Sequence, residues 1–251
     1  MSNLKIAFPQ KTEEDRIRIA KDFYKNFLDT FIETIKFFSL SDKGFAKRFS
    51  GNFEIFKELY ESGQSVQMHS GHFFNWEYMN WGIARNSPYP LLGVYAPMSN
   101  KAVDKLMYKM RSRYNTILIN AYTFRTSFHQ YSNQIYSLGL AADQNPPSPE
   151  KSYWVNFFGK RTAFYVGPEK GARVNNTAVV FVHFYKVKRG YYKADFQLIT
   201  TEPKSYLPGQ LTKQYVGYLE ECIRKTPSNY LWSHRRWKHE FKEEFRNNLI
   251  D

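Results

Sequence analysis

Two side chains suited to acyl transfer lie close together in the segment His72-Phe73-Phe74-Asn75-Trp76-Glu77. An imidazole can take the proton from an attacking hydroxyl, while a carboxylate orients the ring and stabilises the imidazolium that forms. This chemistry needs no nucleophilic side chain. The segment makes His72 a candidate general base with Glu77 as its partner, and a structural histidine is the alternative.

The spacing alone is weak evidence, because His239 and Glu244 repeat it in a polar segment that we interpret as a solvated helix. Residues five apart on a regular helix point about 140° apart. His72 can therefore meet Glu77 only if it lies in a turn before the helix. The turn residues Ser70-Gly71 before it, and Asn75 as a helix cap after it, predict that arrangement.

Other candidate residues have two possible interpretations each. Arg111 and Arg113 end a basic helix and either bind phosphate or form a solvated face. Asp143 ends an apolar run where an α/β sheet opens its crevice, or it belongs to an exposed loop. His69 and His72 could be two metal ligands, but no third ligand at suitable spacing is evident, so we predict no metal and no cofactor.

The elements that would position these residues alternate between strands and helices. Apolar spacing and caps predict helices over residues 12–39, 53–61, 75–84, 101–114, 128–138 and 208–224. Strands are predicted over residues 65–69, 89–96, 116–119 and 140–143, with a hairpin over 178–187 and 191–200. This order predicts one α/β domain with a mixed, largely parallel central sheet flanked by helices. Its helical part covers about 12–62 and its catalytic part about 63–251.

Composition excludes several classes of protein. The chain has 251 residues, 42% of them hydrophobic and 18% aromatic, which is too rich in core formers for a disordered protein. Its single cysteine, Cys222, excludes a disulfide framework. There is no G-x-S-x-G, P-loop, G-x-G-x-x-G or H-E-x-x-H motif, and no signal peptide or spanning apolar run.

The net charge of +13 indicates either solubility or a polyanionic partner. Together with the tryptophans and arginines of Trp232–Lys238, it also fits a basic nucleic-acid-binding protein, which we keep as the alternative from a different class.

A set of motifs in order along nearly the whole chain resembles the bacterial lipid A biosynthesis acyltransferases, of the lysophospholipid acyltransferase superfamily with its glycerol-3-phosphate-acyltransferase-like fold. The motifs of this set are His72-Phe73-Phe74-Asn75-Trp76-Glu77, Asn3-Leu4 with Phe8-Pro9, Arg111-Ser112-Arg113, Asp143-Gln144, and Phe157-Phe158-Gly159 through Thr162 to Gly167-Pro168. The last motif, from Tyr230 to Lys238, is similar to the family's closing W-x-H-R-R-W-K.

The resemblance implies transfer of a fatty acyl chain from an acyl carrier protein thioester to a hydroxyl of a lipid A precursor at the cytoplasmic face of the inner membrane. It makes His72 the general base and Glu77 its partner. Residues implied to bind or shape the substrate site are Asn75, Trp76, Arg111, Arg113, Asp143, Phe158 and Thr162. The carrier protein and a phosphorylated acceptor are both acidic, so both suit the basic chain.

Two departures from the family pattern affect these expectations. The family's hydrophobic anchor would precede the Asn3-Leu4 entry, and here Met1 stands there, so we expect an anchor outside this sequence. Gly171 stands where we expect an apolar residue near the acyl pocket. The superfamily also includes enzymes that acylate aminolipids or phospholipids, some with acyl-CoA as donor, and these are the alternatives of the same class.

Overall fold

A seven-stranded sheet forms the centre of the protein in the computed structural model, which describes residues 1–250. Its strands, in spatial order, are β1 (Phe49–Gly51), β9 (Tyr191–Thr200), β8 (Ala178–Lys188), β2 (Val66–Ser70), β5 (Ser137–Ala141), β3 (Leu91–Tyr95) and β4 (Ile117–Asn120). Only β8 and β9 pair antiparallel; the other neighbours are parallel. The predicted mixed, mostly parallel α/β fold is confirmed.

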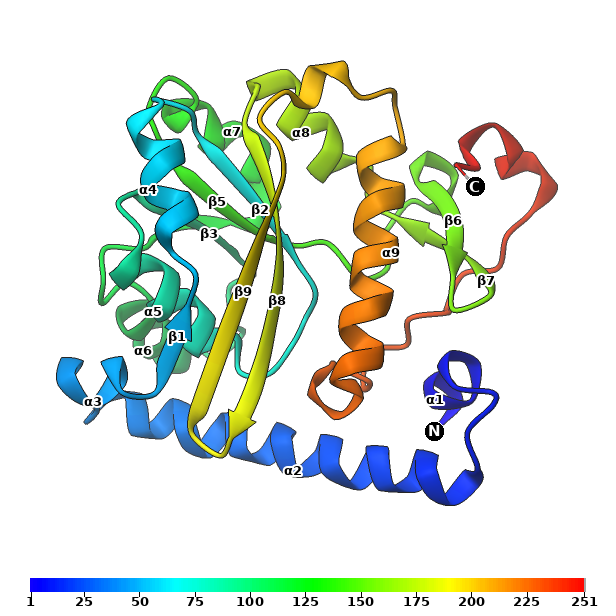
Figure 1. Cartoon of the computed structure of the whole chain (residues 1–251), viewed down its shortest axis with the longest axis horizontal. Coiled ribbons are helices and arrows are strands. Elements are labelled where there is room, and N and C mark those ends of the chain that lie inside the picture. Colours follow the sequence, from blue (N-terminus) through cyan, green and yellow to red (C-terminus); the bar gives the residue numbers. More distant parts are fainter. Residues whose placement is uncertain (251) are drawn as a thin grey trace.

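Helices surround the sheet, and a small second sheet lies beside them (Figure 1). The helices are α1 (Ser2–Ala7), α2 (Glu13–Phe37), α3 (Asp42–Ala46), α4 (Glu54–Glu61), α5 (Trp76–Asn86), α6 (Lys101–Arg111), α7 (Phe124–Ser127), α8 (Gly167–Asn175) and α9 (Gln210–Lys225). The second sheet is the hairpin of β6 (Tyr153–Phe157) and β7 (Lys160–Phe164). Among residues 1–250, no helix combines the length and the apolar composition needed to cross a bilayer.

The helix predicted over residues 12–39 is confirmed as α2. Thr12 caps its first turn, where the Thr12 side chain accepts a hydrogen bond from the Asp15 backbone N–H at 3.2 Å. Such a cap stabilises a helix by about 1 kcal/mol. In Figure 1, α2 runs along one edge of the molecule, across the turn of the β8–β9 hairpin.

The centre of the sheet is buried on both faces. All five residues of β2 are buried, as are the first seven of β8. Parallel strands covered by helices on both sides have this continuous burial, in place of the alternation of a half-exposed sheet. The strand that leads to His72 is therefore a rigid support in the core.

The predicted helix over residues 128–138 is wrong. The α-helix α7 ends at Ser127, and the chain beyond it forms only a short 3-10 helix, Phe128–Tyr131, before it enters β5 at Ser137. β5 hydrogen-bonds to β2 on one side and β3 on the other, so pairing with two neighbours outweighs the local helical spacing. The strand predicted over 140–143 therefore begins earlier, at Ser137, and Asp143 follows its end.

The β6–β7 hairpin and helix α8 were absent from the prediction. The hairpin turns at Phe158 and Gly159, whose φ angles are 53° and 75°. Turns of this kind usually carry Asn-Gly or Asp-Gly, and a phenylalanine at a positive φ angle gives no such signal. The other predicted helices and strands are present, with ends displaced by a few residues.

Candidate active site

His72 lies in the loop between β2 and α5, as predicted. Asn75 is the N-cap of α5, and its side-chain oxygen accepts a hydrogen bond from the Glu77 backbone N–H at 3.0 Å. A Cβ atom at Gly71 would lie 2.6 Å from the buried side chain of Leu219, so a larger residue here would force that side chain to move. The loop leaves the sheet at the carboxyl ends of its parallel strands, where α/β folds place ligands.

The carboxylate that binds the His72 ring belongs to Asp143. Its Oδ1 atom lies 2.5 Å from His72 Nδ1, across the neighbouring ends of β2 and β5. The Asp143 side chain is 1% exposed and the His72 side chain 27%. With Nδ1 held by Asp143, the Nε2 atom is the ring nitrogen left for a substrate proton.

The two groups shift each other's pKa in opposite directions. Burial lowers the pKa of His72, but the charge of Asp143 and its hydrogen bond together outweigh burial and raise it. Burial raises the pKa of Asp143, yet the His72 ring and a hydrogen bond from Tyr230 lower it to about 2. The pair thus keeps a buried carboxylate charged beside a ring able to hold a proton.

Glu77 binds a guanidinium. Its carboxylate accepts hydrogen bonds from Arg111 Nε at 3.0 and 3.1 Å and from Nη2 at 2.6 Å, and one from Trp76 Nε1 at 3.0 Å. The first turn of α5 points Glu77 at the end of α6, where the planar fork of an arginine matches a carboxylate. The pairing of His72 with Glu77 expected from the sequence is thus replaced by two pairs, His72–Asp143 and Glu77–Arg111.

Both pairs lie at one cavity of about 410 Å³. His72, Trp76, Glu77 and Arg111 line it, whereas most of the other side chains in its wall are apolar: Met79, Ile83, Leu91, Val94, Tyr95, Ala96, Leu118, Leu140, Ala141 and Leu231. An apolar pocket with a few convergent polar groups is typical of a ligand site. This one fits a fatty chain with a polar reacting end.

Several lining residues were missed in the sequence. Gly93 on β3 and Gly139 on β5 are register partners, and both line the cavity, where the absence of side chains leaves room. Asn80 lines it too and donates a hydrogen bond to the Arg111 carbonyl at 2.8 Å. A glycine inside a strand often marks the close approach of a ligand, and this was the available signal.

The basic and aromatic segment from Tyr230 to Lys238 contacts Asp143 and the β6–β7 hairpin next to the site. Tyr230 donates a hydrogen bond to Asp143, and burial together with that charge raises the pKa of Tyr230 well above 10. Arg236 is 1% exposed, stacks on Phe164 at 4.2 Å and donates hydrogen bonds to Asn145 at 3.0 Å and Ala163 at 2.7 Å. Arg236 and the two buried tryptophans of this segment, Trp232 and Trp237, therefore have packing roles, whereas Arg235 is exposed.

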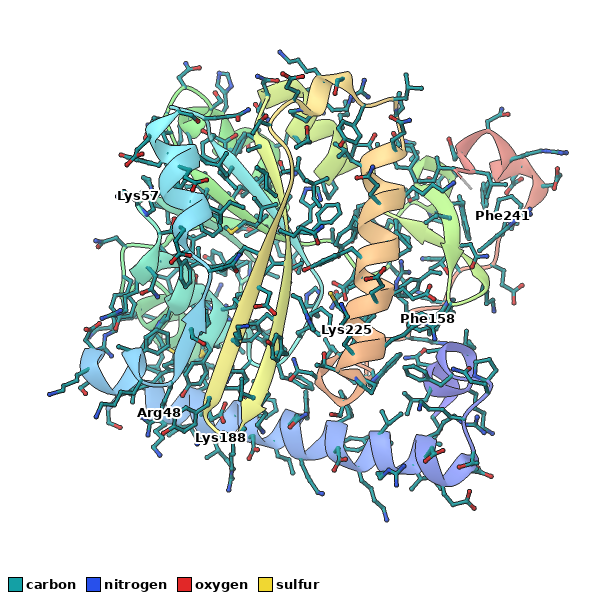
Figure 2. All side chains as sticks on the ribbon, in the orientation of Figure 1. Arg48, Lys57, Phe158, Lys188, Lys225 and Phe241 are labelled. Carbon is teal, nitrogen blue, oxygen red and sulfur yellow. The ribbon has the colours of Figure 1, made fainter. Side chains whose placement is uncertain are left out.

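Five of the residues expected to bind substrate lie outside the cavity lining, and one of them, Asp143, contacts the lining residue His72. Asn75 is fully buried as the cap, and Arg113 stacks on a tryptophan of α5 and donates a hydrogen bond to the carbonyl of Leu40 at 2.8 Å. Phe158 is buried at the hairpin turn, beside α9 in Figure 2, and Thr162 donates to a neighbouring carbonyl within β7. Trp76 and Arg111 do line the cavity, and Asp143 reaches it through His72.

The chain is similar in sequence to known proteins along most of its length. Residues 1–239 match the family model of the bacterial lipid A biosynthesis acyltransferases. The chain is 23% identical over 241 residues to a lipid A biosynthesis palmitoleoyltransferase of Escherichia coli (strain K12). The same identity and length hold for a lipid A biosynthesis acyltransferase of Shigella flexneri. Each match covers 94% of this chain and 76% of the relative. The chain therefore belongs to the bacterial lipid A biosynthesis acyltransferase family.

Proposed function

We propose that this acyltransferase moves a fatty acyl chain from a carrier-protein thioester to a hydroxyl group of a lipid A precursor, with His72 as the general base. The observation that carries the proposal is the His72–Asp143 pair at the polar end of an apolar cavity. The cavity would hold the acyl chain, and its polar end would hold the thioester carbonyl.

In the proposed reaction, His72 Nε2 accepts the proton of the acceptor hydroxyl as its oxygen attacks the thioester carbonyl carbon. The C–O bond forms, the carbonyl oxygen takes the negative charge, and collapse of this intermediate breaks the C–S bond. The thiolate then receives the proton from the imidazolium. Asp143 keeps Nδ1 protonated and stabilises the imidazolium, as a buried carboxylate does in acyl-transfer enzymes.

The Glu77–Arg111 pair would stabilise the charge on the carbonyl oxygen. Glu77 occupies Nε and Nη2 of Arg111, so the guanidinium is fixed in orientation and Nη1 is available to a substrate oxygen. Preorganised donors of this kind act most strongly in a site that excludes water. Glu77 then acts in catalysis through Arg111, while Asp143 is the partner of the imidazole.

The test uses purified protein with an acyl carrier protein thioester and a lipid A precursor, and mass spectrometry of the lipid product. We expect one acyl chain to be added to a hydroxyl by the wild type and none by folded His72→Ala. Acyl-CoA as donor and a phospholipid or an aminolipid as acceptor are the comparison arms. Preferential acylation of one of these would overturn the assigned donor or acceptor, and full activity of His72→Ala would overturn the mechanism.

The proposed location is the cytoplasmic face of the inner membrane, where such a lipid precursor would be available. The net charge of +13 supports it, because anionic lipid, a phosphorylated acceptor and a carrier protein all attract a basic protein.

A further inference from the structure

One face of α2 carries large apolar side chains that are exposed to solvent. They are Ile17, Tyr24, Leu28, Phe31, Ile32 and Ile35, continued by Phe38 just beyond the helix end. Ile35 is 72% exposed. At about 100° per residue these positions fall within an arc of roughly 120°, so they form one stripe along the helix. We call these seven residues the α2 stripe.

The opposite face of α2 is fixed to the body of the protein. Phe23, Thr30, Glu33 and Phe37 are buried. Glu33 accepts hydrogen bonds from the Tyr192 hydroxyl at 2.6 Å and from the Gly190 backbone N–H and the Asn75 side chain, at the β8–β9 turn and the cap of α5. The α2 stripe is thus the outer face of a firmly packed helix, and such contiguous exposed apolar surface usually marks an interaction site.

Basic side chains follow one edge of the α2 stripe. Arg18, Lys21, Lys25 and Lys36 lie roughly 60° to 120° round the helix from Tyr24. Arg18 and Lys25 form exposed ion pairs with Asp15 and Asp22, which are weak in water. The β8–β9 hairpin carries further cations near α2, of which Lys186 and Arg189 form ion pairs with Asp29 of that helix. The acidic residues of α2 that fall within the arc of the stripe are Glu13 and Glu14, both in the first turn of the helix.

The other edge of the α2 stripe leads to the cavity through touching aromatic rings. The ring of Phe31 lies 5.0 Å from that of Phe27, and Phe27 lies 5.9 Å from Phe74. Phe74 in turn lies 5.9 Å from Trp76, which lines the cavity. A surface that covers the stripe would therefore lie next to the loop that holds His72.

We propose that the α2 stripe docks on the surface of an anionic lipid bilayer, with α2 lying in the plane of the interface. An apolar face bordered by lysines is the pattern of interfacial helices, whose cations meet anionic headgroups while the apolar side chains enter the acyl boundary. The site then opens beside the lipid that supplies its acceptor, so this inference rests on the proposed function.

Charge argues against a second copy of the chain as the occupant. In a two-fold interface the same patch meets itself, which would bring the basic edges of two α2 helices near each other. Like charges at an interface disfavour association. An anionic lipid surface has the complementary charge.

The test measures flotation with vesicles of phosphatidylglycerol and phosphatidylcholine. Leu28→Ser and Ile35→Ser remove exposed apolar side chains, and we expect each to weaken binding roughly tenfold even at high salt. Matched controls are Val174→Ser and Leu207→Ser, which are 69% and 67% exposed on other elements and should bind like the wild type.

The basic edge is tested by charge reversal. Lys21→Glu and Lys36→Glu should each weaken binding to anionic vesicles by roughly tenfold at low salt, with little effect at high salt or on phosphatidylcholine. Lys57→Glu makes the same change on α4, at the end of the molecule away from α2 in Figure 2, and should have a much smaller effect.

Two readouts separate docking from catalysis. Leu28→Ser and Ile35→Ser should acylate a detergent-dispersed acceptor at the wild-type rate, whereas His72→Ala should bind vesicles normally and transfer nothing. Vesicle binding that is the same in stripe and control variants would overturn the docking proposal while leaving the function intact. A wild-type dimer that dissociates on Ile35→Ser, with vesicle binding unchanged, would also overturn it in favour of a second copy.

Discussion

Two histidines three residues apart, His69 and His72, have opposite environments. His69 lies inside β2, 2% exposed, with its ring beside Phe181 and Tyr215 and its Nε2 atom 2.6 Å from the Gln67 amide. Burial lowers its pKa to about 4. His72 stands just beyond the same strand, on the cavity, and its pKa is raised by Asp143.

The comparison shows what makes an imidazole suitable as a base. Burial alone produces a neutral ring that cannot hold a proton at neutral pH, as at His69. A carboxylate on one nitrogen and an open cavity at the other produce a ring that can receive a proton and keep it briefly.

His72→Ala should have the largest effect. Loss of a general base typically costs about 10² to 10⁴ in rate, and we expect kcat to fall by that amount with folding retained. Steady-state acyl transfer and circular dichroism measure the two quantities. His69→Gln is the matched variant, and an equal loss of kcat there would contradict the contrast between the two rings.

Asp143→Asn should lower kcat by roughly 10² or more and change the pH profile. His72 acts as a base only when neutral, so kcat/KM should fall as pH drops through its pKa, which lies above the ordinary 6.5 in the wild type. Without the negative charge that pKa falls, and the acid limb should move to lower pH.

The control for this change is Asp42→Asn. The pKa of Asp42 is also lowered to about 2, by Arg85 and Tyr114, but these partners lie at the surface. Its removal should leave the pH profile of transfer unchanged. An unmoved acid limb in Asp143→Asn would show that Asp143 does not set the pKa of His72.

Variants of the second pair should have intermediate effects. Arg111→Lys loses the planar fork, and we expect kcat to fall roughly 10²-fold. Glu77→Gln keeps one acceptor oxygen and should lose about tenfold. Neither should move the acid limb, so a shift in Glu77→Gln like that of Asp143→Asn would restore Glu77 as the imidazole's partner. Arg113→Lys, beside the same helix end but outside the cavity lining, should retain full activity.

His69→Gln should show the smallest effect on transfer, because its role is in folding. The pKa of His69 is about 4 in the folded state and 6.5 in the unfolded state, so the unfolded state binds protons more readily between these values. The contribution of His69 to the free energy of unfolding is therefore at its maximum above pH 6.5. It decreases as the pH falls toward 4, by on the order of 3 kcal/mol. Denaturant titrations at pH 7.5 and 4.5 should show a smaller pH dependence in His69→Gln than in the wild type.

Much of the fold could be predicted because its elements carry strong local signals. The helical period and cap of residues 12–39, and the Gly190 turn between two apolar runs, identified α2 and the β8–β9 hairpin. β5 was misjudged because its sequence is ambiguous in isolation and its two strand neighbours decide its conformation. The β6–β7 hairpin was missed because phenylalanine occupies the turn position where asparagine or aspartate usually precedes the glycine.

At the site, the structure changes the predicted pairing of His72, while the catalytic and binding roles of the residues stay predictions. His72, Glu77, Arg111 and Asp143 were all singled out, and all lie together at the cavity. Which carboxylate meets which cation depends on the adjacency of β2 with β5 and of α5 with α6. Sequence spacing carries no information on adjacency between elements far apart in the chain.

Residue types at short spacing were enough to predict the family, the α/β class, the turn that places His72 before the helix and the amphipathic character of α2. Three features emerge only in the folded chain: Asp143 binds the imidazole, Glu77 binds Arg111, and Gly93 and Gly139 leave room for a cavity. The His72–Asp143 pair and the two glycines depend on which strands lie side by side, and the pairing of β2 with β5 joins residues about 70 positions apart. The Glu77–Arg111 pair depends on α5 lying beside α6.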